Sequence, residues 1–429
     1  MIKDDEKYWS PSGAITPGGP SIWHIIVHDQ RRLISVKMDQ EQDSEDAALA
    51  YLKKSIKKIP FDAVQAYFSL EGKLISTSTD PKDDDTYCIY YPSVDELQSV
   101  NNTNTQKFQT IVRSELEEVD RLGPDVDLVT YPISSKGHGN KFVFKYYYLI
   151  QFKDWIWDEM NILIRLPQHP NLVPFDKVVV DELTGRVVGF TVKHISGGTL
   201  EENPYRTFKL KYLRQLLDVV DYLNLKHGIS HQDVVPRNLL IDENTDSLVL
   251  FDFNYSARIG MRPPHSRKDL YTTRTYAEER NDVKGVWFAM YEIITFDCSF
   301  SQNGLYEQDL DAIERKEWKK HPKASLDRPV SEFRSVLDEW TKKRRMGKQL
   351  KIFTEAPWYI DWPFMAEPTP TVIKSHNPDG SDNVLKIVNY TQPRALERKR
   401  GNPVINWQRP PVDKLKKGVR LLATGETIK

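Results

Sequence analysis

Cysteine is scarce in this sequence: Cys88 and Cys298 are the only two in 429 residues. Two cysteines cannot build a disulfide framework or a cysteine-rich zinc site, which are the usual supports of small secreted domains. We therefore expect a protein of a reducing, intracellular compartment.

Long apolar runs and an excess of charge of one sign are also missing. No uninterrupted apolar run approaches the roughly 20 residues that a membrane-spanning helix needs, and the opening MIKDDEK is too charged for a signal peptide. Lysine and arginine number 60 against 61 aspartate and glutamate, so the overall charge favours neither a nucleic acid nor a membrane surface as partner. These absences predict a soluble protein of the cytoplasm or nucleus.

The rest of the composition is that of an ordinary globular protein, with 39% hydrophobic and 28% charged residues. A chain of 429 residues is long enough for two to three structural units. Polar stretches at 76–85 and 101–106 are typical of linkers. We therefore predict an accessory α/β module with its linker over 1–110, a central domain over 111–346 and an irregular tail rich in proline and aromatic residues over 347–429.

The N-terminal module is predicted from short apolar segments around one amphipathic helix. A leader rich in proline and glycine runs through Pro20, and Ser44 is the predicted N-cap of a helix that Pro60 ends. His24 and His28 have no further ligand-type residues nearby and are interpreted as structural or exposed rather than as a metal-binding pair. The lysines of the helix are interpreted as a solvated face, with a docking surface as the alternative. Strands are predicted at 22–27, 33–38, 64–70 and 73–76.

The stretch around which the chain is organised is 231–238, which reads HQDVVPRN. Two short apolar runs follow it on either side of a turn signal at 242–246, a pattern that predicts a β-hairpin. Such a hairpin would return Asp252 to the neighbourhood of Asn238, and a carboxylate with an amide oxygen suits Mg²⁺ bound together with substrate phosphates. Asp233 would project from the same loop and could accept a proton from, or orient, an incoming hydroxyl. The spacing predicts a phosphoryl-transfer site.

Further motifs lie upstream of this stretch. Residues 142–145 (FVFK) have the pattern of a strand ending on Lys145, the next helical segment carries Glu159, and residues 169–173 (HPNLV) follow that segment directly. With HQDVVPRN and FDFN downstream, residues 114–337 resemble the catalytic domain of eukaryotic protein kinases, of the divergent kind abundant in fungi.

The resemblance implies a fold and a set of roles. The fold would be α+β and bilobal, with a small β-rich N-lobe and a mainly helical C-lobe, and residues 195–200 (ISGGTL) are similar to the hinge that passes the nucleotide. Asp282 would anchor the backbone of the catalytic loop, and Arg328 would pair with Glu278 or Glu279. The implied catalytic residues are Asp233, Lys145, Glu159 and Arg237, the implied metal ligands are Asn238 and Asp252, and the implied nucleotide-binding residues are Gly123, Lys145, Lys193, Ile195, Thr199 and Leu240.

The sequence departs from the family pattern at several of these places. Only Gly123 remains of the glycine-rich phosphate loop, and Asp125 stands where a glycine would let backbone amides approach the phosphates, which is unfavourable for an anionic ligand. Gln232 replaces the arginine that normally receives a phosphorylated activation loop, which predicts a site without that form of control. Asn254 replaces the glycine after the metal-binding Asp and Phe, and no Ala-Pro-Glu motif precedes Asp282.

Three functions are compatible with these observations. The first is a kinase that uses ATP and Mg²⁺ to phosphorylate a protein hydroxyl, on serine or threonine rather than tyrosine. The second is a pseudokinase that acts as a nucleotide-binding or scaffolding module. The third is a small-molecule kinase of the aminoglycoside or choline kinase type, against which the segments 169–173 and 327–329 argue. The tail is interpreted as a linker or a segment that wraps the lobes, with a nuclear localisation or recruitment motif as the alternative; the oligomeric state is left open.

Overall fold

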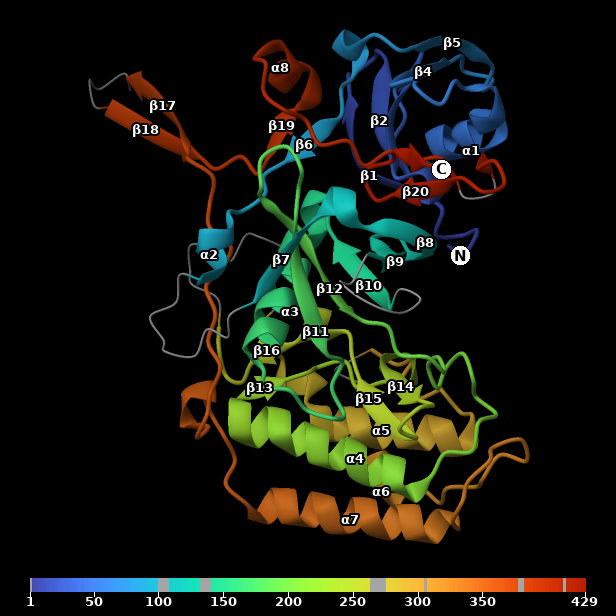
Figure 1. The fold of residues 1–429 in the computed structure, drawn as a ribbon, viewed down its shortest axis with the longest axis vertical. Helices are drawn as coiled ribbons and strands as arrows, with labels where there is room; N and C mark the ends of the chain where they lie inside the picture. The colour runs from blue at the N-terminus through green and yellow to red at the C-terminus, as the bar shows by residue number, and fades with distance from the viewer. Residues whose placement is uncertain are drawn as a thin grey trace.

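The computed structural model of the protein describes residues 2–98, 108–131, 140–262, 275–304, 307–376, 382–411 and 414–429. Three parts follow one another along its long axis (Figure 1): an N-terminal module at one end, a lobe built on a sheet in the middle and a helical lobe at the other end. One hydrophobic core fills the N-terminal module, and another runs through both lobes. The α+β, two-lobed fold expected from the sequence is confirmed.

The N-terminal module is a five-stranded sheet with one helix. The strand order is β1-β2-β3-β4-β5, and β3 and β4 are parallel because α1 crosses between them. Inward-facing residues of the strands, such as Ile25, Val36 and Phe68, form a buried cluster with Ala48 and Leu52 of α1. The elements are β1 (Tyr8–Ile15), β2 (Ser21–Val27), β3 (Arg32–Met38), α1 (Asp46–Ser55), β4 (Gln65–Phe68) and β5 (Leu74–Ser78).

Two details of this module correct the sequence prediction. The segment interpreted as a leader forms β1, an edge strand whose register with β2 shifts between Trp9 and Ser12, around Pro11. Proline is tolerated at such edge positions because no partner strand needs its missing N–H. Ser44 is not the N-cap, because α1 begins at Asp46 and the Ser44 hydroxyl donates to the Asp46 side chain at 3.0 Å.

The middle lobe is an eight-stranded sheet assembled from distant parts of the chain. Its centre has the order β8-β9-β10-β12-β11, which β7 extends at one end and the tail strands β20 and β21 extend at the other. Helix α3 (Lys153–Arg165) follows β10 and is buried along almost its whole length. The strands are β7 (Gln109–Val112), β8 (Glu117–Gly123), β9 (Val126–Thr130), β10 (Lys141–Tyr146), β11 (Phe175–Val180), β12 (Val187–Lys193), β20 (Arg420–Leu422) and β21 (Thr427–Ile428).

The helical lobe packs three long helices around aromatic and aliphatic side chains such as Trp287, Phe333 and Leu337. Two short two-stranded antiparallel sheets, β13 with β16 and β14 with β15, lie between these helices and the middle lobe (Figure 1). The elements are α4 (Leu210–Asp221), β13 (Ile229–Ser230), β14 (Leu239–Asp242), β15 (Ser247–Leu250), β16 (Ala257–Arg258), α5 (Asp282–Thr295), α6 (Leu310–Arg315) and α7 (Val330–Met346).

The tail returns from the helical lobe to the N-terminal module, so it wraps both lobes as one of the sequence interpretations expected (Figure 1). Strand β19 pairs antiparallel with β6 of the linker, and β20 pairs with β8. The predicted boundaries at 110 and 346 stay predictions. The remaining elements are β6 (Tyr87–Ile89), α2 (Val94–Gln98), β17 (Thr371–His376), β18 (Asp382–Ile387), β19 (Thr391–Pro393) and α8 (Arg394–Lys399).

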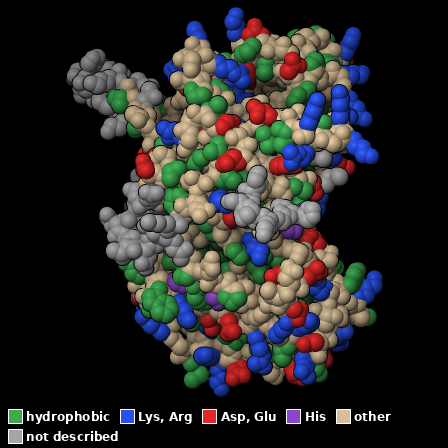
Figure 2. All heavy atoms as spheres, viewed as in Figure 1, with side chains coloured by type: hydrophobic (Ala, Val, Ile, Leu, Met, Phe, Trp, Pro, Cys, Tyr) green, Lys and Arg blue, Asp and Glu red, His purple; other side chains and the backbone are tan. Residues whose placement is uncertain are grey.

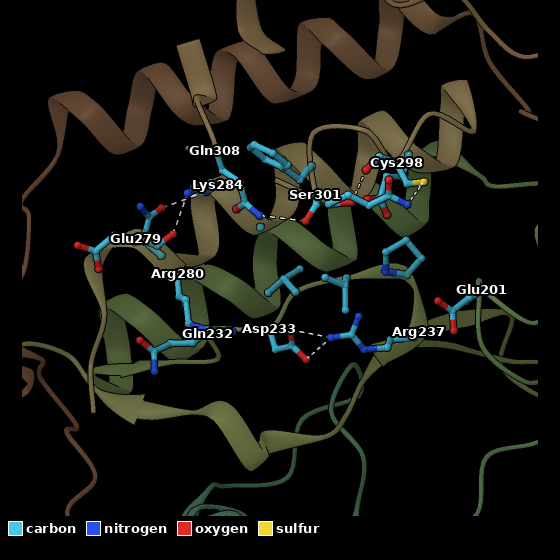
Figure 3. Close-up of a pocket in the computed structure, with 18 residues that line it drawn as sticks. Glu201, Gln232, Asp233, Arg237, Glu279, Arg280, Lys284, Cys298, Ser301 and Gln308 are labelled. Carbon is cyan, nitrogen blue, oxygen red and sulfur yellow. Dashed lines mark hydrogen bonds and ion pairs between the residues drawn. The ribbon is translucent and has the colours of Figure 1, made fainter. Parts of the chain in front are cut away.

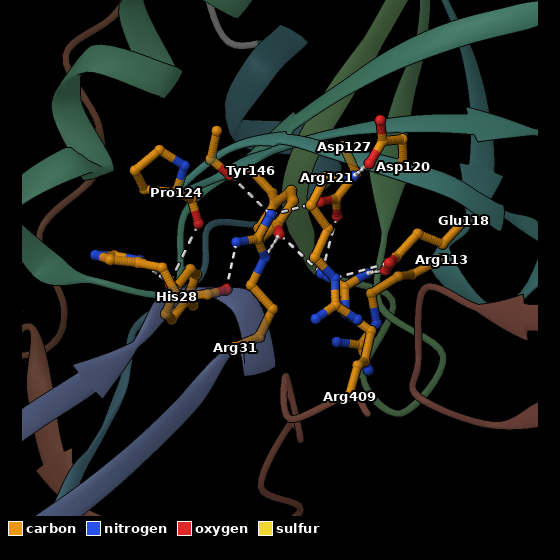
Figure 4. A network of polar contacts seen from close by, with 12 residues as sticks. His28, Arg31, Arg113, Glu118, Asp120, Arg121, Pro124, Asp127, Tyr146 and Arg409 are labelled. Atoms are coloured by element: carbon orange, nitrogen blue, oxygen red, sulfur yellow. Dashed lines mark hydrogen bonds and ion pairs between the residues drawn. The ribbon is translucent and has the colours of Figure 1, made fainter. Parts of the chain in front are cut away.

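A buried ionic network joins the N-terminal module, the middle lobe and the tail (Figure 4). Arg31, in the turn after β2, donates to one carboxylate oxygen of Asp127 in β9 at 2.5 Å, and Arg409 of the tail donates to the other at 2.8 Å. Arg409 also pairs with Glu118 of β8 at 2.9 Å. All four side chains are 0% exposed. Because buried charges are tolerated only when they are paired, this network fixes how the three parts sit together.

The two N-terminal histidines are structural, as predicted. His24 Nδ1 lies 3.0 Å from the Ser12 hydroxyl, and His28 Nδ1 lies 2.6 Å from the hydroxyl of Tyr148 in the middle lobe. Burial, reinforced by the charge of Arg31, lowers the pKa of His28 to about 4, so its ring is neutral at pH 7. His28 is thus a second contact between the module and the lobe.

Across the described residues, no helix combines the length and the apolar character needed to cross a membrane. On the face shown in Figure 2, Lys and Arg side chains gather around the outer rim of the N-terminal module. The lysines on α1 and the turn after it are exposed, as the charge pattern of this helix predicted: Lys53, Lys54, Lys57 and Lys58.

Candidate active site

Three ionisable side chains meet where the two lobes face each other. Lys145 lies near the end of β10, Glu159 lies in α3, and Asp252 follows β15. The Lys145 ammonium is 2.8 and 2.9 Å from the two Glu159 oxygens and 2.5 Å from Asp252 Oδ1. Burial lowers the pKa of Lys145, but the carboxylates of Asp252 and Glu159 outweigh it and raise the pKa overall. Lys145 is therefore a fixed positive charge between the lobes.

The backbone around Asp252 holds this arrangement. Asp252 has a φ of 67°, in the left-handed region that few residues other than glycine adopt. The amide of Phe253 donates to Glu159 Oε1 at 3.1 Å, and the Phe253 side chain is 0% exposed. The carboxylate of Asp252 thus faces Lys145, and the ring of the next residue, Phe253, packs into the core. The structure brings the predicted Lys145–Glu159 pair together, and its role toward a nucleotide stays a prediction.

The predicted catalytic loop lies beside this cluster. Asp233 accepts two hydrogen bonds from Arg237 Nη2, at 2.9 and 3.0 Å, and one from Asn238 Nδ2 at 2.8 Å. The backbone carbonyl of Asn238 accepts from the Phe251 amide at 3.2 Å, so the β14–β15 hairpin does bring Asn238 next to Asp252. Because the amide nitrogen of Asn238 faces Asp233, its amide oxygen points away from Asp233, as a metal ligand would require.

A carboxylate beneath the loop fixes its backbone. Asp282, the first residue of α5, accepts from the amides of His231 and Gln232 at 2.8 and 2.7 Å, which confirms the anchoring role predicted for it. It also accepts from Asn224 Nδ2 at 2.7 Å. Asn224 was not predicted, because it lies in a π-helical turn (Tyr222–Lys226) that the regular period of the preceding helix does not reveal.

Gln232 connects the two ends of the activation segment, the stretch between the FDFN motif at 251–254 and the start of α5 at Asp282. Its Nε2 donates to the carbonyl oxygens of Tyr255 and Thr275 at 2.8 and 3.1 Å, and its Oε1 accepts from the Ala277 amide at 2.6 Å. A neutral side chain therefore holds the segment at the position where the family pattern has a cation. The sequence predicted the loss of the cation, but the new bonds could not be predicted because their partners lie in the backbone far downstream.

Replacing Gln232 by alanine should loosen the activation segment. Three hydrogen bonds with a net worth of roughly 1 kcal/mol each are removed, so amide exchange at Ala277 should become about ten- to a hundredfold faster. Hydrogen–deuterium exchange measured over residues 253–262 and 275–281 tests this expectation. Gln232→Glu, which keeps the acceptor for Ala277 but loses both donor bonds, should give an intermediate rate. Unchanged exchange in the alanine variant would contradict the assigned role.

A short turn stands where the phosphate loop was expected. Only Pro124 and Asp125 lie between Gly123 and Val126, which are paired across β8 and β9. The Gly123 carbonyl accepts from Arg31 Nη2 at 2.8 Å, so the N-terminal module reaches this turn. The single retained glycine thus ends a strand, and its predicted contact with phosphate stays a prediction.

Asp125 brings a carboxyl group into the electrostatic neighbourhood of Lys145 and Asp252. Its backbone carbonyl accepts from the Tyr146 amide at 3.1 Å, which fixes the turn over the end of β10. Burial raises the pKa of Asp125 to about 6, against the opposing effect of Lys145, and Asp252 adds to the rise. The acidic group foreseen in the sequence therefore interacts with both Lys145 and Asp252.

The other predicted nucleotide-binding residues follow the end of β12. Lys193 closes β12 and is exposed, Ile195 is buried, and the two glycines at 197–198 have φ values of 110° and 69°. These values confirm that the chain bends sharply here, as glycine allows. Thr199 then forms a β-bridge with Leu240 in β14. These residues thus connect the middle lobe to the β14–β15 hairpin. Their contact with a nucleotide stays a prediction.

A cavity of about 490 Å³ lies next to Asp233 on the side of the helical lobe (Figure 3). The catalytic loop, the end of the activation segment, α5 and the loop after α5 surround it, and Asp233 and Arg237 face each other along one side. Its charged lining includes both signs: Glu201, Glu279 and Glu292 together with Arg237, Arg280 and Lys284. The cavity therefore leads from solvent to the carboxylate of Asp233.

One ion pair implied by the sequence is not formed. Arg328 is exposed ahead of α7, and within the ranges that the structure describes it makes no ion pair with Glu278 or Glu279. The neighbouring Asp327 accepts instead from the Leu210 amide at 2.8 Å. This motif therefore joins the start of α7 to the start of α4. The activation segment is held by the hydrogen bonds of Gln232 instead.

Comparison with known proteins agrees with this geometry. Residues 129–349, just over half of the chain, match the protein kinase domain family. Similar proteins include CBL-interacting protein kinase 15 of Oryza sativa subsp. japonica, 36% identical over 100 residues that make up 22% of each chain. Another is CBL-interacting serine/threonine-protein kinase 5 of Arabidopsis thaliana, 34% identical over 100 residues, 22% of this chain and 21% of the relative. The matched segments thus span about a fifth of these relatives. The chain belongs to the protein kinase domain family.

Proposed function

We propose that the protein is an ATP-dependent kinase that phosphorylates serine or threonine hydroxyls of other proteins. The observation that carries this proposal is the joint placement of Lys145, Glu159 and Asp252 on one side of the site with Asp233 and Asn238 on the other. Serine and threonine are favoured over tyrosine by the relatives named serine/threonine-protein kinases.

The side chains at the site suit Mg²⁺ bound together with nucleotide phosphates. Asp252 offers carboxylate oxygens and Asn238 an amide oxygen, and Mg²⁺ commonly takes one or two such protein ligands and completes its shell with phosphate and water. In the described part of the chain, no group of three or more His, Cys, Asp or Glu side chains could hold a metal ion alone. A metal here would depend on the nucleotide. Bound Mg-ATP supplies the phosphoryl group and the positive charge that polarises it.

The protein side chains would handle the proton and the charge. Asp233, whose side chain is 9% exposed, is held by Arg237 and Asn238 at the edge of the cavity and would accept the proton of the incoming hydroxyl or orient it. Arg237, which is half exposed, would offset negative charge as it develops. Lys145 would orient the phosphates while Glu159 keeps the ammonium in place.

A protein is the favoured substrate over a small molecule. The cavity beside Asp233 is open and has room, at about 490 Å³, for a side chain and the backbone on either side of it. The segment 169–173 and the match to the protein kinase domain family favour a protein kinase over the small-molecule kinases with a similar loop.

A scaffolding role without phosphotransfer is the second candidate, and one observation favours it. The turn Pro124–Asp125 replaces the phosphate loop, and a charged Asp125 would repel nucleotide phosphates. The pseudokinase and the kinase therefore differ first in whether Mg-ATP binds.

Mg-ATP should raise the melting temperature of the wild-type protein but not of Asp252→Ala. At a nucleotide concentration of 100 times Kd, binding adds about 2.7 kcal/mol to the stability of the folded state. Thermal-shift measurements with and without EDTA test this, and Asp246→Ala, which removes an exposed carboxylate of the same lobe, should behave as wild type. If wild type shows no shift and transfers no phosphate to itself or to generic proteins, the kinase proposal fails.

Asp125→Asn should tighten Mg-ATP binding near neutral pH. Because its pKa is raised to about 6, Asp125 is charged above that pH and neutral below it. We expect the variant to bind about three- to tenfold more tightly than wild type at about pH 7.5, and the difference to shrink at about pH 5.5. Calorimetric titration of both proteins at both pH values tests this, since protonation of ATP affects them equally. A difference that does not depend on pH would contradict the assignment.

A further inference from the structure

The tail holds the two residues of α3 that precede Glu159. Trp157 Nε1 donates to the carbonyl of Pro363 at 2.8 Å, and Trp362 Nε1 donates to Asp158 Oδ1 at 2.8 Å. Trp157 is 1% exposed, Asp158 8% and Trp362 4%. Consecutive residues of a helix point about 100° apart. The tail therefore holds Trp157 and Asp158, on two different sides of α3. Lys145 of β10 holds the next residue, Glu159, on a third side.

The same tail segment is tied to the strand that follows the metal-binding motif. Arg258 of β16 forms an ion pair with Asp361 and donates to the Trp362 carbonyl at 2.8 Å. Its guanidinium carbon lies 4.1 Å from the centre of the Trp362 ring. Trp362 therefore bridges α3, which carries Glu159, and β16, which follows Asp252 in the chain and pairs with β13 ahead of the catalytic loop.

We propose that Trp362 is a positioning residue for phosphotransfer, which sets the rotation of α3 so that Glu159 meets Lys145. This inference rests on the proposed kinase function. Without the indole N–H, the buried carboxylate of Asp158 loses the donor that turns this face of α3 toward the tail. Burial raises the pKa of Asp158 to about 7, and the bond from Trp362 opposes that rise. The tail, which lies outside the matched residues 129–349, thereby helps to place Glu159 next to Lys145.

Three variants of the full chain separate this role from general stability. Trp362→Ala removes the ring and the donor, Trp362→Phe keeps a ring over Arg258 but removes the donor, and Trp358→Ala removes a tail tryptophan that is 63% exposed. Amide exchange in residues 153–165 should be at least about tenfold faster in Trp362→Ala and kcat/KM for ATP about tenfold lower, as expected for one lost buried bond. For Trp362→Phe, both values should lie between those of wild type and of Trp362→Ala. Trp358→Ala should have wild-type values of both.

Replacement of the acceptor gives an independent check. Asp158→Asn keeps an oxygen for the indole N–H and should retain wild-type exchange of α3 and wild-type kcat/KM, whereas Asp158→Leu should resemble Trp362→Phe. The inference is overturned if a folded Trp362→Phe or Trp362→Ala protein shows unchanged exchange over 153–165. If wild type transfers no phosphate at all, the kinase proposal fails by itself, and the exchange data still decide whether Trp362 positions α3.

Discussion

Asp233→Asn should reduce the rate of phosphotransfer by about 100- to 10,000-fold, the range typical of a lost general base. The amide cannot accept the proton of the attacking hydroxyl, and it places an N–H₂ group against either Arg237 or Asn238, which both donate to Asp233 in the wild type. The nucleotide side of the site is untouched. We therefore expect the loss in kcat, with the Mg-ATP thermal shift close to that of wild type.

The rate is measured with labelled ATP, Mg²⁺ and both generic protein substrates and the protein itself. Asp246→Asn is the matched control, because it makes the same chemical change at an exposed turn of the same lobe, where the carboxylate binds Lys209. Transfer by Asp233→Asn at the wild-type rate, with Asp252→Ala inactive, would show that Asp233 takes no part in the reaction.

Asp127→Asn should be the most destabilising single change outside the core. It leaves the buried guanidinium of Arg31 without its carboxylate partner and Arg409 with Glu118 alone, and breaking a buried pair in this way costs about 3 to 5 kcal/mol. For a chain of this size, with an unfolding entropy of about 2.1 cal/mol/K per residue, the melting temperature should fall by about 3 to 6 °C. Thermal melting followed by tryptophan fluorescence measures the change, because Trp407 stacks on Tyr146 beside the network at a centroid distance of 4.7 Å.

The pH dependence of this loss has a definite sign. Burial raises the pKa of Asp127, but Arg31 and Arg409 outweigh it and lower the pKa below the ordinary value. Asp127 therefore contributes stability above the unfolded pKa of about 3.9 and loses it as pH falls further. The gap between wild type and variant should be full at neutral pH and shrink in acid. Asp95→Asn, at an exposed position of α2, should leave the melting temperature unchanged, and an equal melting temperature for Asp127→Asn would rule out a stabilising network.

The hairpin was predictable because its signals are local. Two apolar runs around the turn at 242–246 predicted β14 and β15, and the side chains that this hairpin brings together, Asn238 and Asp252, lie at its two ends. Lys145 and Glu159 were identified through the resemblance to protein kinases, because a lysine at the end of a strand is by itself a weak signal and the HPNLV segment at 169–173 supported the match.

Contacts with the tail could not be predicted by the same reasoning. Trp362 reaches Asp158 across 204 positions of the sequence, from a segment without helical or strand periodicity. Strands β20 and β21 contain three and two residues, too few for an alternating pattern to be recognised. These strands pair with the free edge of β8, and that edge can be recognised only when the whole sheet is known.

The late position of β20 has a consequence for how the chain is made. Its residue Arg420 pairs with Glu117 of β8 across 303 positions, so the edge of β8 opposite β9 stays open until almost all of the described chain has been synthesised. Glu118 and Asp127, which pair with Arg121 and Arg31, gain Arg409 as a second partner only at that stage. Such non-local contacts slow folding, and an exposed edge invites pairing with other chains. The sheet of the middle lobe is therefore complete only after the strands of the tail have been synthesised.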